Sequence, residues 1–187
     1  MILSNVEILK AIKYGGVVID PFPVGVKPKN PPFNTSSVDL KLGSIITIPK
    51  AASFALRPKQ IGDYLKNNSK ELIITRNQPF ILKPKQFVLA KTKEWVGFPI
   101  WQNRGCYSAR VEGKSSIARC GVLVHFTAPT IHAGWEGNIT LEMINLGSND
   151  VLLEPDMYIC QLIIEEVKGT PIVTPSKFRG QTTPAGT

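Results

Sequence analysis

The chain has 187 residues, a length typical of a single domain with a substantial hydrophobic core. Its apolar content of 43% indicates a globular protein, and no apolar run approaches the ~18 residues of a membrane helix, so a membrane protein is not expected. The net charge of +8 comes from scattered lysines and arginines rather than from a dense basic run, which gives little support to binding of a nucleic acid polymer.

The first predicted element is a short amphipathic helix. Ser4 and Glu7 form the pattern of a capping box, apolar residues from Ile8 to Ile12 follow at helical spacing, and Gly15 ends the pattern. Because residues 1–10 already carry this pattern, no signal peptide is expected.

The three cysteines bear on the compartment in which the protein works. Cys106, Cys120 and Cys160 are an odd number and lack the C-x-x-C spacing of metal and redox sites. Reduced and mostly buried thiols fit this usage, so we expect a cytoplasmic protein.

The rest of the chain is predicted to consist mainly of strands. Short apolar runs are separated by Pro, Gly and Asn turns, the pattern of an all-β barrel or jelly roll. The runs are residues 17–20, 38–43, 45–48, 71–75, 80–82, 87–92, 122–126, 139–144, 151–153 and 158–167. Residues 21–33 are rich in proline and are predicted to be a loop, whereas residues 49–69 show only a short helical pattern at 61–66.

A loop suited to an anion precedes the strand at 122–126. Residues 113–116 read Gly-Lys-Ser-Ser and open a short helical stretch at 115–120 that Gly121 closes. Free N–H groups at such a start, beside Lys and Ser side chains, suit a polyanion. The sequence is not a P-loop, because that motif needs a glycine where this chain has Ser108.

Three polar side chains fall inside predicted strands. Asp39 is expected to be solvated or bonded to nearby backbone, and His125 to be a hydrogen-bonded structural imidazole. The period-two run at 139–144 places its odd-numbered residues on one face and its even-numbered ones, Glu142 among them, on the other. By pattern alone, a glutamate here is most often on the polar face of an edge strand.

The end of the chain has a different composition. Residues 169–187, which follow the predicted domain 1–168, are rich in Thr, Pro, Gly and Ser, with Lys177, Phe178 and Arg179 among them. The composition is typical of a flexible tail. The alternative is a lid that orders over a triphosphate, with the two cations meeting phosphates and Phe178 covering the nucleotide.

Several ordered motifs make the chain resemble the dCTP deaminase branch of the dUTPase-like superfamily. They are Gly-Lys-Ser-Ser-Ile-Ala-Arg at 113–119, Val-His-Phe-Thr-Ala at 124–128 and Gly-Trp-Glu-Gly-Asn-Ile-Thr-Leu-Glu at 134–142, with further matches at 1–8, 37–43, 89–94 and 177–181. The resemblance implies a distorted β-barrel with a short N-terminal helix and one short helix at the phosphate loop. It also implies a homotrimer with active sites between subunits.

The implied reaction is hydrolytic deamination of dCTP to dUTP and ammonia. Zinc deaminases need H-x-E and P-C-x-x-C, which neither His125 nor His132 nor the cysteines supply, so no metal ligands are expected at the base. Glu142 is the candidate general base, because a carboxylate can accept a hydrogen bond from the cytosine amino group and a proton from water. A buried carboxylate needs a nearby cation, and Arg119 is the candidate. Magnesium is expected on the triphosphate, not in a protein cage.

The resemblance also implies roles for further residues. Ser115 and the backbone of Ala128 would position the attacking water. Contacts with dCTP, and with dUTP or dTTP as further ligands, would come from Lys114, Ser116, His132, Trp135, Gln161, Lys177, Phe178 and Gln181. Among these, Trp135 would pack on the deoxyribose and leave no room for a 2′-hydroxyl.

Two departures from the family keep alternatives open. Lys114 stands where relatives mostly have Arg. A lysine keeps the positive charge but cannot bind a phosphate with the two parallel hydrogen bonds of an arginine. His132 stands where relatives usually carry the Asp that activates water in dUTPases. The alternatives are therefore a dUTP diphosphatase, alone or combined with deamination to give dUMP, and a catalytically silent nucleotide-binding trimer.

Overall fold

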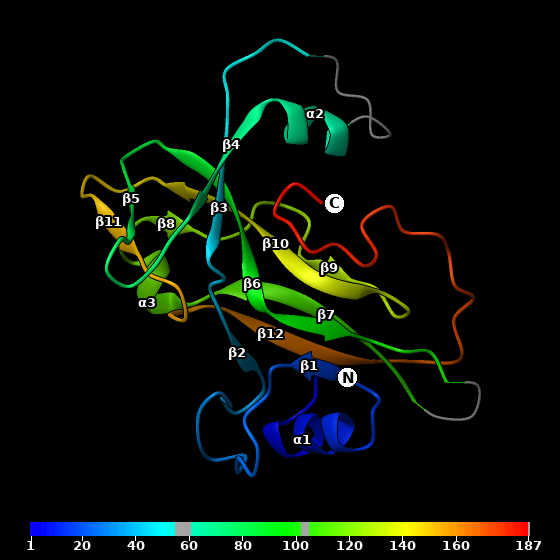
Figure 1. Cartoon of the computed structure of the whole chain (residues 1–187). Coiled ribbons are helices and arrows are strands. Elements are labelled where there is room, and N and C mark those ends of the chain that lie inside the picture. The colour runs from blue at the N-terminus through cyan, green and yellow to red at the C-terminus, as the bar shows by residue number, and fades with distance from the viewer. Residues whose placement is uncertain (55–60, 102–104, 187) are drawn as a thin grey trace.

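Strands dominate the protein, as Figure 1 shows. The computed structural model describes residues 1–54, 61–101 and 105–186. The helices are α1 (Asn5–Lys13), α2 (Ile61–Asn67) and α3 (Ser115–Ala118). The strands are β1 (Val18–Asp20), β2 (Val38–Lys41), β3 (Ile45–Pro49), β4 (Ser69–Ile73), β5 (Phe80–Leu82), β6 (Phe87–Gly97), β7 (Cys106–Gly113), β8 (Val122–Leu123), β9 (Thr130–Ile131), β10 (Glu136–Asn145), β11 (Val151–Leu153) and β12 (Tyr158–Val167).

The largest sheet is built around the two long strands β6 and β10. Its order is β4-β3-β6-β10-β8, and β1 pairs with the far end of β6. All of these pairs are antiparallel, and Glu142 of β10 lies opposite Leu89 of β6. The register shifts between Asn138 and Thr140, where β6 bulges. The Asn138 side chain holds this bulge by donating to the carbonyl oxygens of Thr92, Lys93 and Glu94.

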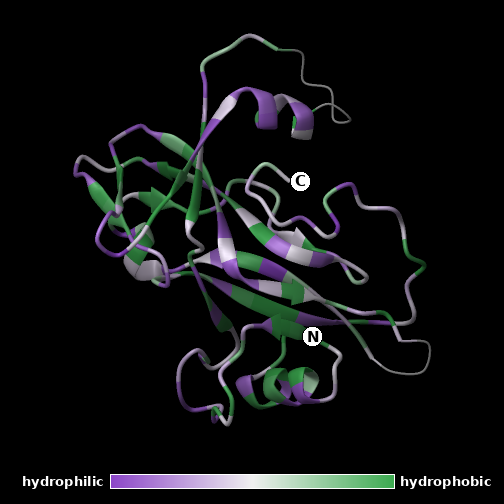
Figure 2. Ribbon diagram, in the orientation of Figure 1, coloured by the Kyte–Doolittle hydropathy of each residue, from purple (hydrophilic) through white to green (hydrophobic). Residues whose placement is uncertain are grey.

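A second sheet has four strands in the order β2-β12-β7-β9, and β11 and β5 form a separate two-stranded antiparallel sheet. The strand β12 is hydrophobic along most of its length (Figure 2). It lies between β2 and β7, so its backbone is paired on both edges. This central position explains why such an apolar run is stable as a strand.

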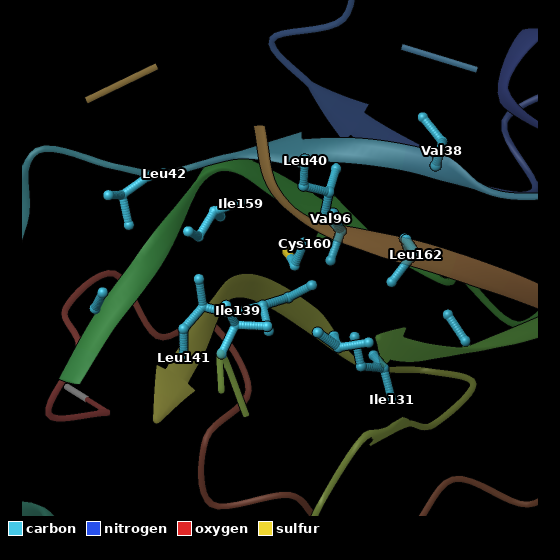
Figure 3. Close-up of a cluster of buried hydrophobic side chains, with 14 of the residues drawn as sticks. Val38, Leu40, Leu42, Val96, Ile131, Ile139, Leu141, Ile159, Cys160 and Leu162 are labelled. Carbon is cyan, nitrogen blue, oxygen red and sulfur yellow. The ribbon is translucent and has the colours of Figure 1, made fainter. Parts of the chain in front are cut away.

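The core fills the space between the two large sheets. Figure 3 shows side chains of both sheets pointing toward one another, with Leu40 and Leu162 from one sheet and Val96 and Leu141 from the other. All four side chains are fully buried. Two sheets packed through such faces form a distorted β-barrel, so the predicted all-β fold is confirmed.

The helices lie outside the sheets. In α1 the Ser4 side chain accepts a hydrogen bond from the N–H of Glu7 at 3.4 Å, which confirms the predicted cap. Ile8 and Ala11 are the buried residues of this helix. No helix within the described ranges is both long and apolar enough to cross a lipid bilayer.

Several elements differ from the sequence prediction. The prediction missed the strand β7, because its polar residues obscure an alternation in which Cys106, Ala109 and Val111 are buried. It gave the strand β8 residues 122–126, but β8 ends at Leu123, and it ended β6 at residue 92, whereas β6 continues to Gly97. The helical pattern at 61–66 is confirmed as α2.

Candidate active site

A pocket of about 410 Å³ lies against the face of β10 that carries Glu142. Five segments line it: β10, part of β6, residues 128–135, the helix α2 and the C-terminal residues 176–186. The predicted site residues Ala128, His132, Trp135, Phe178 and Gln181 therefore share one cavity with Glu142.

The alternation of β10 points Glu142 into this pocket. Leu141 and Met143 are fully buried in the core, whereas Thr140 and Glu142 are half-buried and line the pocket. The predicted division of this strand into two faces is thus confirmed. At Glu142 the strand β10 pairs with β6, whereas the short strand β8 pairs with the other side of β10 only at Ile144 and Asn145.

Burial raises the pKa of the Glu142 carboxyl above its usual range. Its own backbone N–H and that of Phe126 oppose this rise through hydrogen bonds to the carboxylate, and the charge of His125 opposes it further. The result is a carboxylate that holds a proton more readily than an exposed one while remaining stabilised by donors. Such a group is suited to accept and return a proton.

His125 differs from its prediction as a hydrogen-bonded imidazole. Its Nδ1 is buried without a hydrogen-bond partner among the described residues, and its Nε2 lies 3.8 Å from Oε2 of Glu112. The ring therefore lies near two carboxylates, those of Glu112 and Glu142. The strand was expected to bury this side chain with a partner, but β8 ends two residues before it.

Trp135 is held against β10 by a close backbone approach. A Cβ atom at Gly137 would lie 3.1 Å from the indole of Trp135 and 3.2 Å from the backbone N of Gln181, so only glycine fits there. The backbone N–H of Trp135 donates to the carbonyl oxygen of His132 at 3.1 Å. His132 itself is exposed at the pocket lining.

The C-terminal tail is ordered along β10. The Gln181 side chain is buried and donates to the carbonyl oxygen of Asn138 at 2.7 Å, while the N–H of Asn138 donates back to the Gln181 carbonyl at 3.0 Å. Lys91 Nζ donates to the Thr182 carbonyl at 2.7 Å. Arg179 forms a 3.2 Å ion pair with Glu136. The tail therefore lies over the pocket.

The remaining predicted site residues lie elsewhere in the chain. Ser115, Ser116 and Arg119 are exposed on and after α3, and none of them lines the described pocket. Gln161 accepts from Ser37 at 2.9 Å and donates to the Gly113 carbonyl at 3.1 Å. Within one chain, the structure does not bring this group to Glu142.

Lys114 belongs to the same second group. Its Nζ pairs with Oδ2 of Asp39 at 2.5 Å and lies 6.0 Å from the centroid of the Tyr158 ring. The prediction that Asp39 is solvated or bonded to nearby backbone is wrong, because it pairs with a lysine distant in the sequence and accepts from Asn34 at 2.9 Å. The sequence contained no signal for this pair, since it depends on β2 and β7 both lying beside β12.

The pocket also contains residues that the sequence prediction did not name, and two of them lie on α2. Ile61 and Leu65 of α2 line the same cavity as Glu142. Their spacing of four residues was a usable signal for one helix face, but nothing in the sequence indicated what that face meets.

Within the described residues, no group of three or more His, Cys, Asp or Glu side chains is placed to hold a metal ion. The protein is therefore an all-β protein with a small-molecule site, in which a carboxylate lies in an apolar pocket beneath the ordered tail. A family model described as dCTP deaminase-like matches residues 2–167. The chain belongs to this dCTP deaminase-like family.

Individual relatives agree over almost the full length. A dCTP deaminase of Haloarcula marismortui is 36% identical over 197 residues, covering 98% of this chain and 92% of that protein. A "dCTP deaminase, dUMP-forming" of Methanosphaera stadtmanae is 37% identical over 196 residues, covering 98% and 91%. The crystal structure of the 2′-deoxycytidine 5′-triphosphate deaminase from Agrobacterium tumefaciens matches with a TM-score of 0.65 at 19% identity. That match covers 87% of this chain and 46% of the other, and it shows that the two share a fold.

Proposed function

We propose that the protein is a dCTP deaminase, which converts dCTP and water to dUTP and ammonia. The observation that carries this proposal is the half-buried Glu142 carboxylate in a pocket beside Trp135 and beneath the tail. Membership of the dCTP deaminase-like family supports the same substrate and reaction. The buried side chains of Cys106 and Cys160 fit a cytoplasmic enzyme.

Glu142 can serve each proton transfer of this reaction. Its carboxylate accepts a hydrogen bond from the cytosine amino group, which the oxygen of uracil cannot provide. It takes a proton from water as the water oxygen attacks C4, and it gives a proton to the amino group, which leaves as ammonia. Departure of ammonia leaves a hydroxyl at C4, and passage of its proton through Glu142 to N3 gives the C4 carbonyl and the N3–H of uracil. Ser115 and the backbone of Ala128 are proposed to hold the attacking water.

The rest of the site is proposed to come from a second subunit. Ser115 and Arg119 lie on and after α3, away from the pocket of their own chain. A symmetric homotrimer would place α3 of one subunit at the Glu142 pocket of the next, where Arg119 would hold the carboxylate ionised. Each subunit would thus contribute its Glu142 pocket to one active site and its α3 residues to another.

The triphosphate is proposed to contact polar and charged side chains from both halves of the site. Lys114, Ser116 and Gln161 would meet it on one side, and Lys177 would approach from the tail, where its Nζ lies 5.6 Å from the centroid of the Phe178 ring. Magnesium would arrive with the substrate as Mg–dCTP, because this ion is usually held by phosphate oxygens and water.

Ammonia release from dCTP with magnesium tests the proposal. We expect turnover by the natural chain and a loss of at least ~10²-fold in Glu142→Gln, the scale of general acid–base catalysis. No turnover, or full activity of Glu142→Gln, defeats it. Tight binding of dCTP without product would instead support a catalytically silent binding protein.

A second candidate is the combined reaction that ends in dUMP. His132 lines the pocket with an exposed imidazole, and the relative from Methanosphaera stadtmanae is named dUMP-forming. A neutral imidazole can act as a base near pH 7 but lacks the charge of a carboxylate. Pyrophosphate release from dUTP that disappears in His132→Ala would establish this activity, and its absence in the natural chain would reject it.

A further inference from the structure

The helix α2 forms one wall of the Glu142 pocket, although it lies in the long connection between β3 and β4. Ile61 and Leu65 line the pocket and are four residues apart, so they lie on one face of the helix. Asp63, Lys66 and Asn67 are exposed. The helix α2 therefore presents apolar side chains to the pocket and polar ones to solvent.

The end of the tail lies beneath α2 (Figure 1). Pro184 and Ala185 are buried and line the same pocket as the helix. Gly62 is also buried, and a Cβ atom at this position would lie 3.9 Å from the carbonyl oxygen of Ala185. Thr140 of β10 donates from its hydroxyl to the Pro184 carbonyl at 3.4 Å. Two segments far apart in the sequence thus meet above β10.

We propose that α2 and residues 184–186 form a two-part cover over the Glu142 pocket, in which Ile61 and Leu65 hold the tail down and exclude water from the carboxylate. The inference rests on the proposed function, because water exclusion matters to the reaction only if Glu142 takes part in it. Ile61 and Leu65 are positioning residues, since they act through the tail and through the dryness of the site. A dry site strengthens every electrostatic contact of the carboxylate.

In this proposal, α2 acts on Glu142 through burial rather than through charge. The charged residues of α2, Asp63 and Lys66, are exposed. The titratable groups on the other side are His125, which acts on Glu142 directly, and His132 in the pocket lining. Since burial raises the pKa of Glu142, opening the cover should lower that pKa toward its usual value.

Hydrogen exchange without nucleotide tests the contact between the two parts. In Leu65→Ala, we expect the peptide spanning residues 176–186 to exchange roughly fivefold to tenfold faster, because a half-buried apolar anchor is lost. The matched control is Asn67→Ala, which changes an exposed residue of the same helix. Unchanged exchange of the tail in Leu65→Ala, with exchange across 61–67 still as slow as in the natural chain, overturns the proposal.

A variant in the tail tests the same contact from the other side, without changing the helix α2 itself. Ala185→Asp places a charge in a buried position of the tail, where Ala185 is 5% exposed. We expect it to accelerate exchange across residues 61–67 by a similar factor. If residues 61–67 exchange as slowly in Ala185→Asp as in the natural chain, α2 and the tail do not form a shared cover.

The pH profile provides a readout that structural damage alone would not move. Glu142 must be ionised to act as a base, so a lower pKa moves the acid limb of kcat/KM to lower pH in Leu65→Ala. An acid limb at the same pH as in the natural chain and in Asn67→Ala overturns the water-exclusion role. If the natural chain releases no ammonia, the proposed function fails, whereas the exchange experiments need no substrate and still decide whether the cover exists.

Discussion

At the scale of single residues, Glu142 combines a useful chemistry with an energetic cost. Its carboxylate lies in an apolar pocket of its own chain, and burial raises its pKa. Between the pKa of the unfolded chain and the raised pKa of the folded one, the folded protein binds more protons. The contribution of Glu142 to stability is therefore present at low pH and is lost as the pH rises through the raised pKa.

This sign predicts that Glu142→Gln stabilises the unassembled chain near neutral pH, where no Arg119 of a second subunit faces the carboxylate. The amide carries no charge to desolvate, so the melting temperature should rise at about pH 7, with roughly 2–4 °C for each ~1 kcal/mol gained at this chain length. At about pH 4, where ordinary glutamates are largely protonated, the gain should shrink. Thermal melts at both values check this, with the exposed Glu154→Gln as the control. A variant that melts lower at neutral pH would show that the carboxylate stabilises the fold.

Lys114 allows a second prediction at this scale. Its ammonium group, held beside Asp39, is proposed to meet a phosphate that takes no part in the chemistry. Lys114→Ala should therefore raise KM for dCTP by roughly tenfold to a hundredfold and leave kcat nearly unchanged, since a charge-assisted hydrogen bond is worth roughly 1.5–3 kcal/mol. Steady-state kinetics checks the split, with Lys10→Ala on α1 as the control. A fall in kcat at constant KM would place Lys114 in the reaction itself.

At the scale of elements, the tail is held to β10 by contacts of unequal strength. The Arg179–Glu136 ion pair is exposed, with side-chain accessibilities of 51% and 47%, so it should contribute less than about 1 kcal/mol. The Gln181 side chain is buried, and its loss would leave the Asn138 carbonyl without this donor. The buried amide should therefore dominate.

This ranking predicts the order of two variants. Gln181→Ala should accelerate chymotryptic cleavage after Phe178 by roughly tenfold, whereas Glu136→Gln should change it by less than about threefold. Timed digestion followed by mass spectrometry measures both rates. If breaking the ion pair opens the tail as much as removing the amide, the ranking is wrong.

The sequence predicts those elements whose limits depend on local signals. The strands β5, β11 and β12 have the predicted bounds, because turn residues flank short apolar runs. The strand β7 was missed because its polar face is explained only by partners on other strands, such as Glu165 for Arg110. The same limit applies to the site: the role of Glu142 follows from its motif, but the wall made by α2 depends on tertiary contacts that no local pattern contains.

At the scale of the whole molecule, the division of the predicted site residues into two groups has a direct genetic consequence. If Glu142 and Arg119 of one site come from different subunits, two inactive variants can restore each other. Mixed trimers of Glu142→Gln and Arg119→Ala at equal amounts should contain intact sites at about a quarter of positions by random assembly. Activity after joint refolding measures this. Continued inactivity of well-mixed trimers would mean that each chain completes its own site.

Gly137 lies close to both the Trp135 ring and the backbone of Gln181, so the fluorescence of Trp135 should report the position of the tail. Departure of the tail would let water reach one side of the indole, and its fluorescence should shift to longer wavelength. The chain also contains Trp95 and Trp101, so the difference between the spectra of the natural chain and of Trp135→Phe isolates the emission of this ring. Titration with nucleotide would then follow the movement of the tail in real time without any attached label.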